Sequence, residues 1–446
     1  MKIAGKQMLK FNEENVKRQK TSKQKRDKVV RQSRVLNYEK LIINCSRLKP
    51  KYLNLGLLIP ILAISIFGVL MVYSASWYNA TIYFNNPFYF FTSQLIGFII
   101  GILMLTLTYF LDYKVYRRFS WVIIGIATFL LLLVFVPGLG ITRLGASRWI
   151  GIGGFTMQPS ELAKFAFIIF AAKVASETFK TKEKSMPEQV KSKKRFGLKP
   201  KGTSSADGVS RHLSIKQLGL ILLIGGGFCG LILLQPNLSI VMTLGATMFV
   251  CLFLFGAKLK HLGILLLPVL VIVPIMLVAE PYRISRLVAF VDPWATPRAE
   301  GFQLIQSLFS LGNGGLFGRG FLNSTQKYMF LPFSESDFIF SIIGEEFGLV
   351  GAMLFLATLG YIIWRIFKVG RESTDTFGKY LCFGIAVLIF IQSVLNIAVV
   401  TGSIPPTGLP LPFISFGGTS LAVFMAAIGI VLNIDKQNKK MTSSIN

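Results

Sequence analysis

The stretch FIFSIIGEEFGLVGAMLFLATLGYIIW, residues 338–364, decides the fold class of this chain. It is longer than the roughly 20 mainly apolar residues that a helix needs to cross the hydrocarbon core of a bilayer. Further apolar stretches lie at about 53–74, 89–111, 119–137, 161–175, 217–235, 238–257, 262–280, 379–400 and 417–434. The sequence therefore predicts an all-α polytopic membrane protein with about ten transmembrane helices.

Composition and charge agree with this prediction. Of the 446 residues, 52% are hydrophobic and 15% are charged, whereas an ordinary soluble domain has about a quarter of its residues charged. The net charge of +28 would suit a nucleic-acid-binding protein, but 40 of the 48 Lys and Arg residues fall in segments that ten spans place on one side of the membrane. The positive-inside rule makes that side the cytoplasm. We therefore expect both termini to be cytoplasmic and expect no nucleic-acid partner.

The polar segments divide the chain into regions. Residues 1–51 are Lys-rich and predict a disordered cytoplasmic tail. Residues 52–434 form the predicted transmembrane domain, within which 176–216 is a long basic cytoplasmic loop. Residues 435–446 complete the chain as a cytoplasmic C-terminal tail.

Two segments on the opposite side stand out. Residues 281–337, between spans 7 and 8, form a long extracytoplasmic loop with apolar and glycine-rich stretches that predict ordered structure. A long loop with such content is more often functional than a mere linker. Residues 401–418, TGSIPPTGLPLPFISFGG, cannot form regular helix because of their prolines and glycines. Such backbone is tolerated where it is buried in protein or lines a cavity.

Proton transfer on the extracytoplasmic side would need a carboxylate, because His212 and His261 both fall on the cytoplasmic side. Asp337 is the leading candidate, since it lies where the long loop meets a span. The alternative is that it merely caps the helix that follows. Glu345 and Glu346, about two turns further, predict a polar interior, because charges at that depth need partners or a wet cavity.

Other charged residues near this side have two interpretations each. Glu161 and Lys164 are three residues apart and can pair on one helix face, either as a structural salt bridge or as part of a polar cavity. Arginines suit phosphate oxygens, but they can also reach to lipid headgroups. The candidates are Arg148, Arg283, Arg286 and Arg319. At this point an enzyme acting on a lipid-linked substrate and a transporter both stay open.

Four strings carry a family resemblance. They are GASRWIGIGGFTMQPSELAKF, DPWATPRAEGFQLIQSL, FLNSTQKYMFLPFSESDFIFSIIGEEFGLVG and TGSIPPTGLPLPFISFGGTSL. In this order they resemble the SEDS (shape, elongation, division and sporulation) family of peptidoglycan glycosyltransferases, from about residue 53 to 434. The NSTQK, IIGEE and PPTGLPLPFISFGG elements are more similar to the FtsW and SpoVE branch than to RodA.

The resemblance implies polymerisation of undecaprenyl-linked lipid II, with Asp337 as the general base by its position in the motif. Cations would stabilise the leaving diphosphate. The resemblance suggests Arg148, Arg283 and Arg319, with Lys327 as an alternate, and Mg²⁺ or another divalent cation could share this task. Glu161 and Lys164 would shape the cavity that receives the substrate. No organic cofactor is expected.

The resemblance also implies partners and a location. A class B penicillin-binding protein would supply transpeptidase activity, alongside other division proteins, at the septum of the bacterial cytoplasmic membrane. A lipid II flippase and a non-catalytic division scaffold are the rival functions. A secondary transporter is disfavoured, since the second half of the chain shows no convincing repeat of the first.

Overall fold

The computed structural model describes residues 52–143, 146–152, 155–184, 213–265, 267, 274 and 281–443. The predicted tail at 1–51 lies outside the described residues, as do most of the basic loop at 176–216 and much of the predicted span at 262–280.

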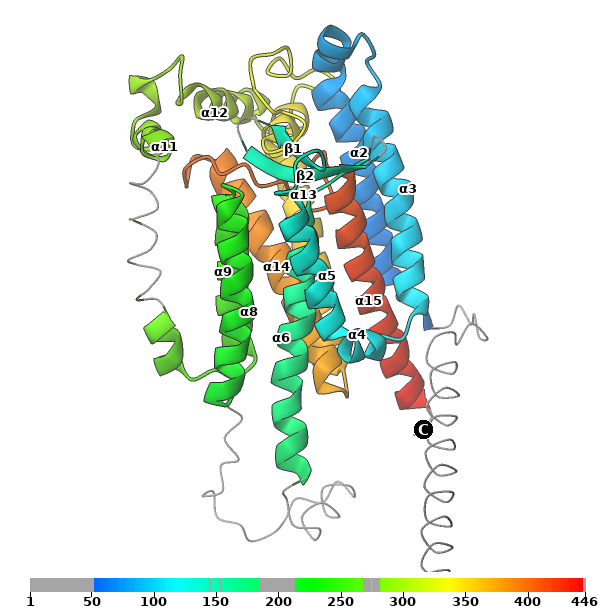
Figure 1. Ribbon diagram of the computed structural model, residues 1–446. Coiled ribbons are helices and arrows are strands. Elements are labelled where there is room, and N and C mark those ends of the chain that lie inside the picture. Colours follow the sequence, from blue (N-terminus) through cyan, green and yellow to red (C-terminus); the bar gives the residue numbers. More distant parts are fainter. Residues whose placement is uncertain are drawn as a thin grey trace, which may run out of the picture.

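The described chain is mostly helical, and its long helices run side by side as a bundle (Figure 1). In chain order the helices are α2 (Leu55–Phe84), α3 (Tyr89–Phe110), α4 (Lys114–Arg118), α5 (Ser120–Leu133), α6 (Pro159–Lys184), α8 (Ile215–Leu234), α9 (Leu238–Leu254), α11 (Pro281–Val291), α12 (Phe302–Gly314), α13 (Ile339–Glu372), α14 (Thr376–Val400) and α15 (Gly418–Ser443), with a short 3-10 helix, η2 (Pro293–Ala295). In the described part, six of them are long and apolar enough to cross a membrane, namely α2, α3, α8, α13, α14 and α15.

The predicted apolar stretches outside 262–280 all coincide with helices, although the boundaries differ. The largest differences are in α2, which continues to Phe84, beyond the predicted end at 74, and in α6, which runs from Pro159 to Lys184 and so extends beyond the predicted 161–175 at both ends. The last helix, α15, continues to Ser443 and therefore includes most of the predicted tail at 435–446. A prediction from hydropathy detects only the apolar part of a helix, so it misses polar turns at either end.

The all-α prediction needs one correction, because a small antiparallel sheet follows α5. It consists of β1 (Gly140–Arg143), β2 (Ala146–Ile152) and β3 (Phe155–Met157), in that order. Ile150 of β2 is the central residue, since it pairs with Gly140 on one side and Met157 on the other. Strands this short are invisible to an analysis that searches for apolar stretches of membrane-spanning length.

Small residues allow α3 and α15 to pack closely. A Cβ placed on Gly97 would stand 2.4 Å from the Cα of Gly418, and one placed on Gly429 would stand 2.3 Å from the carbonyl oxygen of Leu105. Glycine at such positions lets helix backbones approach each other, which is a common basis of helix association in membranes.

Helix α13 is kinked at Gly348, whose φ of 67° and ψ of −168° are not helical. The kink leaves room for the preceding loop, because Leu349 and Val350 donate backbone hydrogen bonds to the carbonyls of Gly315 and Leu316. A Cβ on Gly348 would stand 2.3 Å from the backbone nitrogen of Gly318. Only glycine tolerates this conformation readily, so the residue type fixes how the loop docks onto α13.

Between α14 and α15 the chain is irregular, as the prolines of 401–418 predict. Leu409, Leu411, Phe413 and Ile414 are nevertheless buried in the bundle. The segment passes close to α2, since a Cβ on Gly68 would meet the carbonyl oxygen of Phe413 at 2.6 Å. Buried irregular backbone needs internal hydrogen-bond partners, and these partners build the candidate site.

Candidate functional site

The candidate site centres on Asp337, directly before α13. Hydrogen bonds to its main-chain carbonyls tie the loop that carries Asp337 to the irregular segment between α14 and α15. Ser415 Oγ donates to the carbonyl of Ser336 at 2.6 Å, and the Phe416 amide donates to the carbonyl of Glu335 at 2.9 Å. Ser334 Oγ joins the same loop to α2 by donating to the carbonyl of Ala75 at 3.1 Å. The backbone beneath Asp337 is therefore held from two sides.

Asn396 on α14 completes this support. Its Nδ2 donates to the carbonyl of Asp337 at 2.8 Å and to the carbonyl of Leu409 at 2.6 Å. Gly408 adjoins the carboxylate itself, because a Cβ on this residue would stand 3.2 Å from Asp337 Oδ2. Asp337 is thus fixed through its main chain, while its side chain lies against a residue that has no side chain of its own.

The environment of Asp337 makes its carboxyl group a weaker acid than usual. Burial raises the pKa of Asp337 to about 6, and the neighbouring Glu335 carboxylate acts in the same direction. The positive charges of Arg286 and Arg148 and a hydrogen bond from Ser336 lower the pKa, but do not cancel the effect of burial. Burial also raises the pKa of Glu335. A carboxylate with a pKa near the working pH is suited to general base catalysis.

Two arginines approach Asp337 from different elements. Arg148, on β2, donates to the carbonyls of Gln235 and Pro236 in the turn between α8 and α9. Arg286, on α11, donates to the carbonyl of Pro406 at 3.3 Å. Backbone carbonyls thus help to position both side chains, and a guanidinium group is well suited to bind an anion such as a phosphate.

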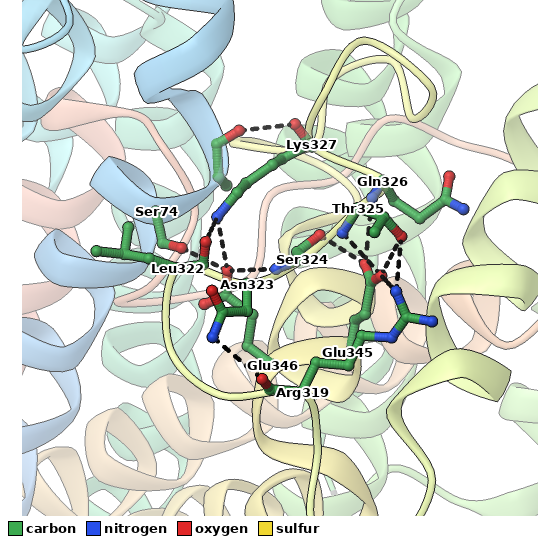
Figure 2. A network of polar contacts seen from close by, with 12 residues as sticks. Ser74, Arg319, Leu322, Asn323, Ser324, Thr325, Gln326, Lys327, Glu345 and Glu346 are labelled. Atoms are coloured by element: carbon green, nitrogen blue, oxygen red, sulfur yellow. Dashed lines mark hydrogen bonds and ion pairs between the residues drawn. The ribbon is translucent and has the colours of Figure 1, made fainter.

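The other predicted cations lie elsewhere. Arg283 belongs to α11, but its side chain is outside the described part of the structure. Arg319 and Lys327 join the Glu345 and Glu346 carboxylates in a polar network (Figure 2). The charge of Arg148 lowers the pKa of Asp337. Arg319 and Lys327 instead pair with Glu345 and Glu346.

Glu345 is the more heavily hydrogen-bonded acid of this network. Its Oε1 accepts from the Thr325 amide at 2.9 Å and from Thr325 Oγ1 at 2.7 Å. Its Oε2 accepts from Ser324 Oγ at 2.5 Å and from Ser310 Oγ at 3.2 Å. Arg319 Nη1 lies 3.8 Å from Oε1. These contacts fasten the loop after α12 onto the first turns of α13.

Glu346 forms the second half of the network and connects it to α2. Its Oε1 accepts from Ser74 Oγ at 2.6 Å and lies 3.2 Å from Lys327 Nζ. Lys327 is fully buried and also donates to the carbonyl of Leu322. Burial lowers the pKa of Lys327, while the Glu346 carboxylate acts in the opposite direction. A buried ammonium so closely engaged is suited to holding the fold together.

Glu161 and Lys164 form a second buried ion pair, as their spacing predicts. Lys164 Nζ lies 2.7 Å from Glu161 Oε1 and donates to Gln392 Oε1 at 2.7 Å. Ser420 Oγ donates to Glu161 Oε2 at 3.0 Å, and Gln392 Nε2 donates to the carbonyl of Pro410 at 2.8 Å. The pair therefore links α6, α14 and α15 to the segment that also supports Asp337.

Sequence reasoning did not select Glu335, Gln392 or Asn396 as site residues, and it considered Arg286 as a candidate cation without selecting it for the leaving diphosphate. Gln392 and Asn396 carried a readable signal, because they are two polar residues four apart in the otherwise apolar stretch 379–400. At that spacing both lie on one face of a helix, and polar groups within a membrane span usually mark function or interior packing. Glu335 and Arg286 carried no comparable signal beyond their charge.

The arrangement around Asp337 suits proton abstraction beside a developing negative charge. Within the described residues, no cluster of three or more His, Cys, Asp and Glu side chains could hold a metal ion. Glu335 and Asp337 could contribute carboxylate oxygens to a divalent cation only if a substrate supplied further ones, which is a common way for Mg²⁺ to bind.

Comparison with known proteins identifies relatives along almost the whole described chain. The family model described as "Cell cycle protein", FTSW_RODA_SPOVE, matches residues 55–440. Stage V sporulation protein E of Bacillus subtilis (strain 168) is 36% identical over 386 residues, covering 86% of this chain and 98% of that protein. The probable peptidoglycan glycosyltransferase FtsW of Geobacter sulfurreducens (strain DL-1 / KN400) is 37% identical over 389 residues, covering 86% and 96%.

Solved structures agree with this fold. A chain from the structure described as "Structural coordination of polymerization and crosslinking by a peptidoglycan synthase complex" has a TM-score of 0.66 and 26% identity, covering 86% of this chain and 98% of that one. The crystal structure of Thermus thermophilus rod shape determining protein RodA has a TM-score of 0.58 and 23% identity, covering 86% and 97%, and supports the fold alone.

Proposed function

The chain belongs to the FtsW, RodA and SpoVE family of cell cycle proteins, and on this premise we propose that it is a peptidoglycan glycosyltransferase that polymerises lipid II. Relatives that carry the name probable peptidoglycan glycosyltransferase support the activity. The single observation that carries the mechanism is the Asp337 carboxyl, whose pKa is raised to about 6 by burial.

In the proposed reaction the growing glycan on undecaprenyl diphosphate is the donor. Asp337 accepts the proton of the 4-hydroxyl of an incoming lipid II disaccharide. The hydroxyl oxygen forms a bond to the anomeric carbon of the donor, and the bond from that carbon to the diphosphate breaks. The diphosphate leaves with the electron pair and needs no proton, so one general base suffices.

The leaving diphosphate gains negative charge that nearby cations would stabilise. Our principal candidates are Arg148 and Arg286. The positive charges of both lower the pKa of Asp337, so both act on the region around its carboxyl. Arg283 remains a candidate from the sequence. For Arg319 and Lys327 we favour a structural role over the predicted substrate contact, since both are engaged by the Glu345 and Glu346 carboxylates.

A divalent cation such as Mg²⁺ remains part of the proposal for the diphosphate. When bound, it would supply charge stabilisation to the leaving oxygens. Glu335 is the carboxylate that fits this role best, because Asp337 must stay available for the proton. Glu161 and Lys164 keep their proposed role in shaping the polar interior that receives the lipid-linked sugar, with Gln392 as their neighbour.

The chain is a multi-pass membrane protein, and we propose ten spans with both termini in the cytoplasm. Residues 52–434 then form the membrane domain, and 281–337 its extracytoplasmic catalytic loop. This orientation puts Asp337 at the outer face of the cytoplasmic membrane. We propose that the protein acts at the division septum. This proposal is based on relatives that carry the names FtsW and stage V sporulation protein E.

A class B penicillin-binding protein is the proposed partner, together with other division proteins. The structural relative from a peptidoglycan synthase complex supports this idea. Large apolar side chains are exposed on the predicted catalytic loop, among them Val291, Trp294 and Phe317. Exposed apolar groups of this size often mark a protein interface. Co-purification in mild detergent tests the pairing, and dissociation of the two proteins under those conditions would count against a stable complex.

The function is tested by lipid II polymerisation with the purified protein and its partner, the transpeptidase being blocked. The Asp337→Asn variant should lose glycan strands by about 10²–10⁴-fold, the usual contribution of a general base. Glu300→Gln is the control, because it removes the same charge from a carboxylate of the same loop that is exposed, unlike Asp337. Full activity of Asp337→Asn would move the base elsewhere. Absence of polymerisation in every sample would favour the flippase or the scaffold.

A further inference from the structure

A basic pocket lies at the end of the bundle opposite Asp337. Its volume is about 770 Å³, and four cations line it, Lys114, Arg117, Arg118 and Lys173. The acids that face it are Glu177 and Asp375, so the pocket carries an excess of positive charge. Figure 1 shows α4, which supplies three of the cations, at the end of the bundle away from the strands and α12.

Contacts hold two of the four cations of this pocket in place, Arg117 and Lys173. Arg117 Nη1 lies 4.0 Å from Asp375 Oδ1, and the Arg117 side chain is only 18% exposed. The Arg117 guanidinium also stands over the ring of Phe377 at 5.9 Å, and Lys173 Nζ stands over the ring of Trp121 at 5.9 Å. Arg117 and Lys173 are therefore held against the protein, while Lys114 and Arg118 are exposed at the rim of the pocket.

The pocket adjoins an apolar surface that faces outward. Phe119 and Trp121, next to α4 and at the start of α5, are 41% and 52% exposed. Val122, Ile126 and Phe129 continue this exposed apolar surface along α5. In a membrane protein such a surface is covered by acyl chains, and exposed aromatic residues typically mark the level of the headgroups.

We infer that this pocket binds the phosphate headgroup of an anionic phospholipid, with the acyl chains lying along the exposed face of α5. Basic pockets between helices at the cytoplasmic end of membrane proteins are suited to such headgroups. A soluble phosphate compound would use the same cations but would gain nothing from the apolar surface beside them. The inference is independent of the reaction proposed for Asp337, at the other end of the bundle.

The test compares lipid retention by the purified full-length protein. Protein extracted into detergent is incubated with phosphatidylglycerol or phosphatidylcholine, and bound lipid is counted by native mass spectrometry. Wild type should retain phosphatidylglycerol in preference to phosphatidylcholine. The double variant Arg118→Gln/Lys173→Gln should lower phosphatidylglycerol retention by about tenfold or more, since each Lys or Arg near an anionic lipid contributes a several-fold factor.

A matched control removes the same charge elsewhere. Lys258 and Lys260 are exposed residues that follow α9 and lie outside the pocket lining, so Lys258→Gln/Lys260→Gln should retain phosphatidylglycerol as wild type does. An equal loss in both double variants would overturn the proposal, because net charge alone would then explain binding. Displacement of the lipid by millimolar inorganic phosphate would overturn it too, in favour of a soluble ligand. Circular dichroism of each variant confirms that the comparison is between folded proteins.

Discussion

Two pairs of acidic residues lie close together in the sequence, Glu335 with Asp337 and Glu345 with Glu346, but their surroundings differ. Glu345 and Glu346 are buried, and serine, threonine, lysine and arginine side chains surround them. Glu335 and Asp337 are held through their main-chain carbonyls by Phe416 and Asn396. The carboxylates of Glu345 and Glu346 therefore stabilise the fold. For Glu335 and Asp337, main-chain groups do this, and we propose that their carboxylates serve the reaction.

Charge and position alone therefore do not identify a reactive carboxylate. Glu345 and Asp337 are both acidic residues near the start of α13, but hydroxyl and amide donors surround the Glu345 carboxylate, whereas burial raises the pKa of Asp337 to about 6. The network around Glu345 instead anchors the loop that follows α12. The structural role of the Glu345 and Glu346 network and the reactivity of Asp337 can be measured separately.

The largest effect is expected when the network loses its buried cation. Lys327→Met leaves the Glu346 carboxylate without its ion-pair partner at 3.2 Å. Removing one partner of a buried ion pair typically costs about 3–5 kcal/mol of stability. Thermal unfolding in detergent measures this loss.

Lys368→Met provides the control for that experiment. Lys368 pairs with Glu372 at 3.9 Å, but the two side chains are 39% and 54% exposed. Exposed pairs are worth about 0–1 kcal/mol, so this variant should unfold close to wild type. Similar stability of the two variants would show that Lys327 is no part of the structural framework.

A smaller loss is expected from Gly348→Ala. Alanine would be strained at a φ of 67° and ψ of −168°, at about 1–3 kcal/mol, and its Cβ would collide with the loop backbone at Gly318. Thermal unfolding should report a clear loss. Gly360→Ala in the same helix is the control, because a Cβ there meets nothing within 4 Å, and alanine is the better helix former. Equal stability of both variants would contradict the described kink.

The pH dependence of polymerisation reports on the second pair of acids. With a pKa of Asp337 of about 6, the reactive carboxylate is the main form above that pH and is lost below it. The rate should therefore fall about tenfold per pH unit on the acid side, once pH is well below 6. Initial rates between pH 5 and 8 test this, with circular dichroism at each pH to exclude unfolding. A rate that stays constant down to pH 5 would contradict a base of this pKa.

The smallest expected effect is on the position of the pH profile of Arg286→Gln, in addition to the loss of maximal rate that the proposed role of Arg286 at the diphosphate predicts. Because the Arg286 charge lowers the pKa of Asp337, its removal should move the acid side of the pH profile upward by a fraction of a pH unit, a modest change in differential interaction. Arg298→Gln removes the charge of an exposed residue in the same long loop and should leave the profile in place. A shift of equal size in both variants would indicate a general charge effect.

Much of the fold could be predicted from the sequence, because an apolar stretch of membrane length has few alternatives to a helix. The family resemblance is confirmed as well. The strands at 140–157 were missed because β2, the longest, has only seven residues and so is far shorter than a membrane-spanning stretch. The kink at Gly348 was missed because a glycine inside an apolar stretch gives no sign of its backbone angles.

The site was predictable only in part, for a different physical reason. Asp337 could be named from its place at a helix entry, and Glu161 and Lys164 from their spacing. The distribution of cations could not, since a sequence shows charges but not which acid each one meets. Lys327 pairs with Glu346, and Arg319 lies beside Glu345. Arg286 instead acts on Asp337, since its charge lowers the pKa of that carboxyl. Only the folded path of the loop after α12 decides this.

The most direct test of the central contrast measures polymerisation rate and thermal stability for Asp337→Asn and Glu345→Gln on the same preparations. Ionised Asp337 is disfavoured in the folded protein, because its folded pKa of about 6 exceeds the ordinary value of 3.8. Neutral Asn should therefore not lower stability at pH 7.5. We predict that Asp337→Asn stays folded and loses polymerisation, and that Glu345→Gln loses stability and keeps activity per folded molecule. An active Asp337→Asn, or an inactive Glu345→Gln of full stability, would contradict the account.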